Sequence, residues 1–122
     1  MTKYENICIV DDEPVFAEIQ IDILRENKIN VQYFDSIEYF MKEIRDKCIH
    51  KFDLIVLDRY FIPEDYDSLE DGLANQLKSS NSFGYKGKIF LWTNGAMKYE
   101  EAVEKGFDDF LTKGTLILDK IG

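Results

Sequence analysis

Short, mostly apolar runs alternate along this chain with longer stretches whose apolar residues recur at helical spacing. The runs cover residues 7–10, 31–34, 54–57, 89–92 and 109–111. Strands that alternate with helices predict a parallel sheet covered by helices on both faces. Three of the runs, ICIV, LIVL and IFLW, are apolar throughout, which is typical of strands that are buried on both sides.

Four helices are expected between these strands, each with apolar residues three or four positions apart. Their apolar faces are Phe16, Ile19, Ile23 and Leu24 in the first, Ile37, Phe40, Met41, Ile44 and Cys48 in the second, Leu69, Leu73 and Leu77 in the third, and Ala102 and Val103 in the fourth. Pro14 suits the first turn of the first helix. Ser36 is expected to cap the start of the second helix, and Gly106 to end the fourth.

One connection is longer than such a fold requires. Residues 59–71 contain several acids together with Tyr60, Phe61 and Tyr66. Acidic side chains cannot be buried without partners, whereas aromatic ones offer contact area. We therefore expect this segment to be a lid or a docking element rather than part of the core.

Length and charge limit the classes of function. A chain of 122 residues forms one domain, expected to span residues 1–122. A formal charge of −9 repels phosphate backbones, so direct nucleic-acid binding is not expected, whereas a basic protein or a divalent cation would be attracted. No apolar stretch is long enough for a membrane span or a signal peptide, which predicts a cytoplasmic protein without membrane insertion.

Histidine and cysteine are too scarce for several kinds of site. The only histidine, His50, makes a histidine-based triad or a multi-histidine metal site improbable. Cys8 lies in an apolar run and is expected in the core. Two cysteines do not form a disulfide framework.

The polar residues that end the predicted strands are the strongest functional signal. The first strand is followed by Asp11 and Asp12, the third by Asp58, the fourth by Thr93 and the fifth by Lys113. In an open α/β sheet, ligands bind outside the carboxyl ends of the strands. Clustered carboxylates require a cation between them, and an oxygen-only site suits Mg²⁺. One carboxylate could then act as a nucleophile toward a phosphoryl group, with the lysine and the threonine binding its oxygens.

This arrangement resembles the receiver domain of two-component response regulators over essentially the whole chain. The matching pieces are ICIVDDEP, LIVLD, IFLWTN and GFDDFLTKG, in the right order and at the right spacing. The resemblance implies a flavodoxin-like, doubly wound sheet of five parallel strands in the order 2-1-3-4-5 within a three-layer αβα fold. The few residues after Lys113 leave room only for a short or truncated last helix.

The same resemblance implies a role for each residue of the site. Asp58 would be the phosphoacceptor, and Mg²⁺ would be held by Asp11, Asp12, Asp58 and the backbone carbonyl of Tyr60. Thr93 and Lys113 would respond to the phosphoryl group, and Phe110 would be an aromatic switch. The donor would be a phosphohistidine of a sensor kinase or a histidine phosphotransfer protein. The signal would pass to a downstream protein or to an output domain.

Simpler interpretations remain open for individual residues. Asp11 and Asp12 could merely cap the first helix, and Phe110 could be an ordinary core residue. Glu13 is expected to be a solvated neighbour of the acidic pair. Gly114 stands where the family usually has proline; because a non-proline cis bond costs about 2.5–4 kcal/mol, we expect a trans peptide between Lys113 and Gly114.

Two other functions compete with the phosphoacceptor. A degenerate receiver would bind a partner without being phosphorylated. A phosphohydrolase of the haloacid dehalogenase type would also use an aspartyl nucleophile with Mg²⁺. Such enzymes usually carry a second aspartate two residues after the nucleophile, where this chain has Glu13 or Tyr60, and no cap domain is expected here.

Overall fold

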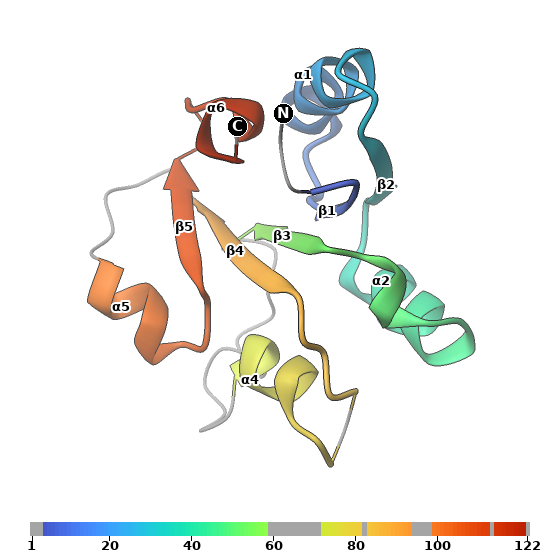
Figure 1. The fold of residues 1–122 in the computed structure, drawn as a ribbon, viewed down its shortest axis with the longest axis vertical. Coiled ribbons are helices and arrows are strands. Elements are labelled where there is room, and N and C mark those ends of the chain that lie inside the picture. The colour runs from blue at the N-terminus through green and yellow to red at the C-terminus, as the bar shows by residue number, and fades with distance from the viewer. Residues whose placement is uncertain (1–3, 59–71, 82, 94–98, 113, 122) are drawn as a thin grey trace.

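Five parallel strands form one sheet in the order β2-β1-β3-β4-β5, the order that the family resemblance implies (Figure 1). The computed structural model describes residues 4–58, 72–81, 83–93, 99–112 and 114–121. The strands are β1 (Asn6–Val10), β2 (Asn30–Phe34), β3 (Leu54–Asp58), β4 (Lys88–Thr93) and β5 (Asp109–Thr112). Each predicted apolar run lies inside one of these strands.

Helices cover both faces of the sheet and complete the expected three layers. They are α1 (Pro14–Glu26), α2 (Ile37–Asp46), the 3₁₀ helix η1 (Ile49–Lys51), α4 (Gly72–Lys78), α5 (Tyr99–Glu104) and α6 (Ile117–Ile121). On one face of the sheet, α1 and α6 pack against the strands and form one apolar cluster. On the opposite face, α2, α4 and α5 form the other. Among the described residues, α6 spans five positions and is as short as expected.

The three inner strands have side chains buried on both faces. On β1, Ile7 and Ile9 belong to the cluster under α1, whereas Cys8 and Val10 belong to the cluster under α2. All four are fully buried, as the unbroken apolar run predicts. Full burial of such a side chain stabilises the fold by about 1.5–3 kcal/mol, so these strands contribute much of the stability of the sheet that carries the site.

Local signals set the helix ends. Pro14 occupies the first turn of α1, and the Ser36 side chain accepts the N–H of Tyr39 at the start of α2 with a distance of 3.0 Å. Gly106 follows α5 with φ of +93°, a conformation that residues with a side chain adopt at a cost. These three predictions are confirmed.

The predicted apolar face of α1 is right for Leu24 but wrong for Phe16 and Ile19. Phe16 and Ile19 are exposed, and the buried residues are Ala17, Gln20, Ile21 and Leu24. Many positions of this helix are apolar, so two different faces have apolar residues at helical spacing. The face that packs against the sheet is the one that includes Gln20.

Two smaller expectations also fail. Cys48 is exposed because α2 ends at Asp46, and Ile49 of η1 fills the core position instead. Val103 is 47% exposed, so that Ala102 alone anchors α5.

Some predictions fall outside the described residues. These are the place of Leu69, the lid in residues 59–71, and the peptide between Lys113 and Gly114. Within the described part of the chain, no helix has the length and apolar character that crossing a bilayer requires.

Candidate functional site

Asp11, Asp12 and Asp58 come together at the carboxyl end of the sheet. Asp11 follows the last residue of β1, and Asp58 is the last residue of β3. These strands are neighbours, with Val10 in register with Leu57, so the two chains leave the sheet side by side. One carboxylate oxygen from each of the three aspartates lies within 4.8 Å of the others. Asp11 and Asp58 are fully buried, whereas Asp12 is exposed.

Hydrogen bonds fix the backbone that carries the acidic pair. The N–H of Asp11 donates to the carbonyl of Phe34 on β2 at 3.1 Å, and its carboxylate Oδ1 accepts the N–H of Glu13 at 2.9 Å. The phenol of Tyr33 donates to the carbonyl of Asp11 with 2.5 Å between the oxygens. The N–H and the carbonyl of Asp11 are thus both hydrogen-bonded to β2, and the Asp11 side chain binds the backbone two residues further on.

These bonds argue against a simple capping role for the acidic pair. The residue at the N-cap of α1 is Glu13, which makes no side-chain capping bond. The Asp11 carboxylate accepts the N–H of Glu13, the N-cap residue itself, which lies ahead of the first helical residue Pro14. Glu13 itself is half-buried.

Thr93 lies beside the acids on the next strand. It is the last residue of β4 and fully buried, and its neighbour Trp92 is in register with Asp58 on β3. On β5, Thr93 is in register with Thr112, the residue before Lys113. Lys113 and Tyr60 lie outside the described residues.

Phe110 is on β5 as expected, in register with Leu91 of β4. Its ring is half-buried and packs against the apolar cluster under α2, α4 and α5. This position is compatible both with a core role and with a ring that changes exposure.

The chemistry of the donor set fits a hard divalent cation. All three side chains offer carboxylate oxygens, and two of them are held in a buried position close to a third. Mg²⁺ prefers oxygen ligands and is typically bound by one or two carboxylates with water completing its shell. Asp11, Asp12 and Asp58 are therefore the residues that would hold it.

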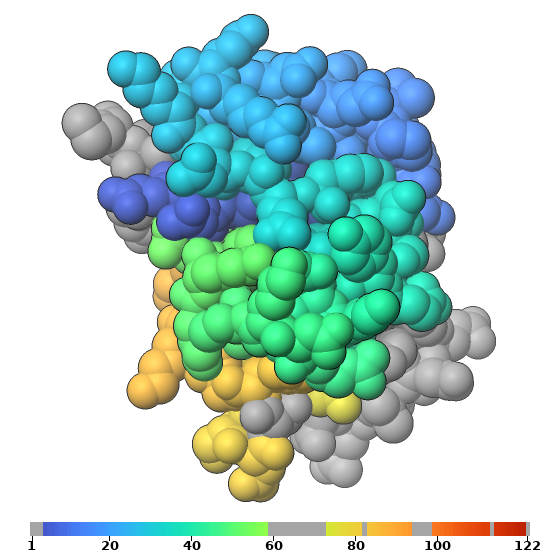
Figure 2. All heavy atoms as spheres, turned by 90° about the vertical axis from the view of Figure 1, so that its right-hand side faces the viewer, coloured from blue at the N-terminus to red at the C-terminus, as the bar shows by residue number. Residues whose placement is uncertain are grey.

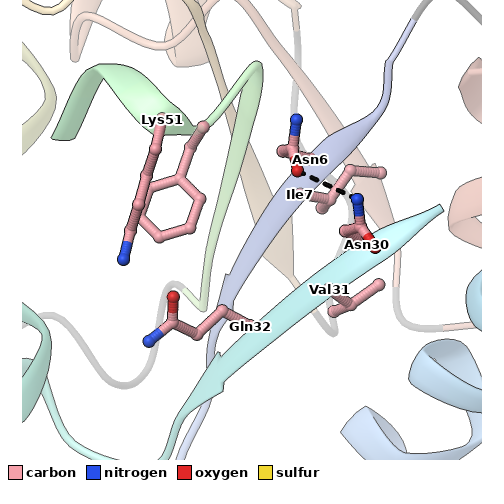
Figure 3. Close-up of a pocket in the computed structure, with 7 residues that line it drawn as sticks. Asn6, Ile7, Asn30, Val31, Gln32 and Lys51 are labelled. Carbon is pink, nitrogen blue, oxygen red and sulfur yellow. Dashed lines mark hydrogen bonds between the residues drawn. The ribbon is translucent and has the colours of Figure 1, made fainter. Parts of the chain in front are cut away.

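Among the described residues, the groove at the other end of the sheet contains no comparable cluster of acids. The groove in Figure 3 is lined by residues from the amino ends of β1 and β2 and from η1, among them Asn6, Asn30 and Lys51. The amide of Asn30 donates to Asn6 at 3.2 Å, and the ammonium of Lys51 lies 5.0 Å from the centre of the Phe52 ring. These residues are occupied with one another, and the groove is far from the acids along each strand.

Cys8 does not add a nucleophile. Cys8 is fully buried, and this burial raises the pKa of its thiol well above the usual value. A thiol that stays protonated is a poor nucleophile.

Sequence reasoning missed Tyr33. The spacing of residues 31–34 places it in a strand, where an aromatic residue is ordinary. Its contact with Asp11 depends on the pairing of β2 with β1, in which Tyr33 is in register with Ile9. A tyrosine instead of phenylalanine, close to the end of a strand beside the acids, is the only signal that the sequence contains.

Solved receiver domains share this fold. A response regulator receiver protein from Burkholderia phymatum is 17% identical with a TM-score of 0.70, and covers 91% of this chain and 84% of its own. The BeF3-activated N-terminal receiver domain of Klebsiella pneumoniae RstA is 20% identical with a TM-score of 0.69, covering 95% and 92%.

A third structure contains a receiver domain with its partner. The co-crystal structure of the Saccharomyces cerevisiae histidine phosphotransfer signaling protein Ypd1 and the receiver domain of its downstream response regulator Ssk1 matches with 19% identity and a TM-score of 0.71, covering 99% of this chain and 88% of that one. No protein-family model and no curated protein sequence matches the chain. At these identities the likeness is one of fold.

Proposed function

We propose that this chain is a phosphorylation-controlled signalling domain that accepts a phosphoryl group on Asp58. The observation that carries the proposal is the cluster of Asp11, Asp12 and Asp58, with Asp58 at the end of the central strand β3. The receiver fold supports the same function, because solved domains of this architecture include a BeF3-activated one.

The proposed reaction is a phosphoryl transfer from nitrogen to oxygen. A carboxylate oxygen of Asp58 bonds to phosphorus while the bond between phosphorus and the donor imidazole breaks. The electron pair stays on the imidazole nitrogen, which takes up a proton. A bound Mg²⁺ would neutralise charge on the phosphoryl oxygens. Thr93 would donate a hydrogen bond to one of these oxygens, and Lys113 would pair with another.

The partner would carry the phosphohistidine and dock beside the acids. Val15 and Ile19 on α1 are 70% and 56% exposed, and Phe16 between them is 39% exposed. This apolar patch begins three residues after Asp12, so a donor seated on it would hold its imidazole near Asp58. Figure 2 shows the edge of the molecule where α1, in blue, lies above β2 and α2. A histidine kinase or a histidine phosphotransfer protein fits this role, and the signal would leave through a downstream protein or an output domain.

Phosphoramidate tests the proposal, because it has the same phosphorus–nitrogen bond as phosphohistidine. With Mg²⁺, the wild-type protein should gain the mass of one phosphoryl group, and Asp58→Asn should gain none. Asp35→Asn is the matched control: it removes an exposed acid that follows β2 and should react like the wild type. Phosphorylation of Asp58→Asn would contradict the assignment.

The reaction with phosphoramidate, together with a second assay on phosphomonoesters, separates the competing functions. Steady release of phosphate from phosphomonoesters would favour a phosphohydrolase. A wild-type protein that does not react with phosphoramidate would favour a binding module that works without phosphorylation. Ile19→Lys should react normally with phosphoramidate but slowly with phosphorylated histidine phosphotransfer proteins, because only the protein donor needs the α1 patch.

A further inference from the structure

We propose that Tyr33 is a positioning residue for the acidic site, and that its hydroxyl holds the peptide between Asp11 and Asp12 in the orientation that binds the cation. The evidence is the hydrogen bond from the Tyr33 hydroxyl to the carbonyl of Asp11, at 2.5 Å. This inference rests on the proposed function insofar as it concerns Mg²⁺, but its structural part is tested separately.

The position of this carbonyl explains why one hydrogen bond matters. The carbonyl of Asp11 and the N–H of Asp12 belong to the same planar peptide group. Fixing the direction of the Asp11 carbonyl therefore fixes the peptide plane to which the Cα of Asp12 belongs, and with it the position from which the Asp12 side chain extends. Just before it, the N–H of Asp11 is already bound to Phe34, so the Tyr33 hydroxyl removes the remaining freedom of the Asp11 backbone.

Repulsion between the acids gives this restraint its function. Three carboxylates with oxygens within 4.8 Å of one another push their side chains apart when no cation lies between them. Asp12 is the exposed member of the three and has the most space to move away. A peptide plane that cannot rotate keeps Asp12 close to Asp11 and Asp58 before the cation arrives, which lowers the cost of binding.

The hydroxyl, rather than the ring, is the group that acts. The ring of Tyr33 packs against the apolar cluster under α1, which a phenylalanine would do equally well. The hydroxyl lies among Asp11, Asp35, Asp12 and Glu18, and burial together with these carboxylates raises the pKa of Tyr33 to about 12. A phenol is protonated at neutral pH, so the Tyr33 hydroxyl can donate to the carbonyl of Asp11.

Tyr33→Phe removes the hydroxyl, and Tyr85→Phe is the matched control. The hydroxyl of Tyr85 also donates to a backbone carbonyl, that of Phe52, at 2.8 Å. Phe52 lies just before the first residue of β3, at the end of the sheet away from the acids. Mg²⁺ binding is followed by the fluorescence of the only tryptophan, Trp92, which is in register with Asp58. The loss of one positioning hydrogen bond should weaken Mg²⁺ binding about two- to tenfold in Tyr33→Phe. Tyr85→Phe should bind Mg²⁺ like the wild type.

Amide hydrogen exchange measured without Mg²⁺ tests the structural part. Exchange at Asp12 and Glu13 should be faster in Tyr33→Phe than in the wild type, and unchanged in Tyr85→Phe. If the wild type binds no Mg²⁺ but this exchange difference is present, the proposed function fails while the positioning role holds. Unchanged exchange at Asp12 and Glu13 in Tyr33→Phe would overturn the positioning role. So would an equal loss of Mg²⁺ affinity in both variants, because a general loosening of the fold would explain it.

Discussion

Gln20 on α1 accepts the backbone N–H of Ile117 in the first turn of α6, with 2.8 Å between Oε1 and the amide nitrogen. Gln20 is only 5% exposed, and Ile117 is fully buried. The first N–H groups of a helix have no partner within it, so a buried helix start needs an acceptor from elsewhere. This bond attaches the last described helix to the helix that follows the acidic pair.

Replacing Gln20 with leucine should destabilise the fold although it makes the core more apolar. The buried N–H of Ile117 would lose its acceptor, which costs about 1–3 kcal/mol in the free energy of unfolding. Urea denaturation measures this loss. Glu18→Gln, an exposed change on the same helix, is the control and should leave the midpoint nearly unchanged. A Gln20→Leu protein as stable as the wild type would contradict the role of this bond.

Gly106→Ala should destabilise the turn after α5 by about 1–3 kcal/mol. Gly106 has φ of +93°, and an added Cβ would lie 2.5 Å from Oδ1 of Asn75 on α4. Adding Asn75→Ala should recover only part of the loss, because it removes the clash but not the backbone strain.

Gly114→Ala is the control for this prediction. A Cβ at Gly114 meets no heavy atom of the described residues within 4 Å, and its φ is outside the left-handed region. Thermal unfolding of the four proteins provides the comparison. Equal melting temperatures for Gly106→Ala and Gly114→Ala would show that a side chain at position 106 does not destabilise the turn, which would contradict the prediction.

The sheet could be predicted from the sequence because its signal is local. The run LIVL is apolar at every position, which is typical of a short strand buried on both faces, and the helical stretches between such runs indicate a parallel sheet. The acidic cluster follows in turn, because parallel strands bring Asp11 and Asp58 to one edge whatever the details of packing.

The buried face of α1 could not be predicted, because it depends on a distant partner. A glutamine in a helix is usually exposed, but Gln20 is buried where its side chain accepts the N–H of Ile117. Tyr33 is a similar case: its role depends on a carbonyl that a neighbouring strand brings to its hydroxyl. Hydrophobic spacing contains no information about such polar contacts.

Tyr85 should make stability depend on alkaline pH. Burial, with Cys8 and Asp53 nearby, raises the pKa of Tyr85 above its ordinary value near 10. The folded state therefore retains the phenolic proton more tightly than the unfolded state does. The stabilisation is complete below about pH 10 and is lost as the pH rises above that value, where the unfolded chain ionises first.

Tyr85→Phe separates this effect from the hydrogen bond. At neutral pH the variant should be less stable by about 0.5–1.5 kcal/mol, because the bond to the carbonyl of Phe52 is lost. Above pH 10 its stability should decline less steeply than that of the wild type. Urea denaturation at a series of pH values measures both, and parallel declines would contradict the assignment.

Asp12→Asn should have opposite effects on stability with and without Mg²⁺. Without the cation, the change removes one of three mutually repelling carboxylates, so the melting temperature should rise, by an amount equivalent to roughly 1 kcal/mol. With saturating Mg²⁺, the wild type should gain more stability than the variant, because it binds the cation more tightly and binding to the folded state stabilises it. Asp22→Asn removes the same charge from an exposed position on α1 and is the control for net charge. Because the Asp12 carboxylate is a proposed ligand, the order of the two melting temperatures should reverse between the two conditions. Equal Mg²⁺ affinities in Asp12→Asn and the wild type would show that Asp12 does not hold the cation.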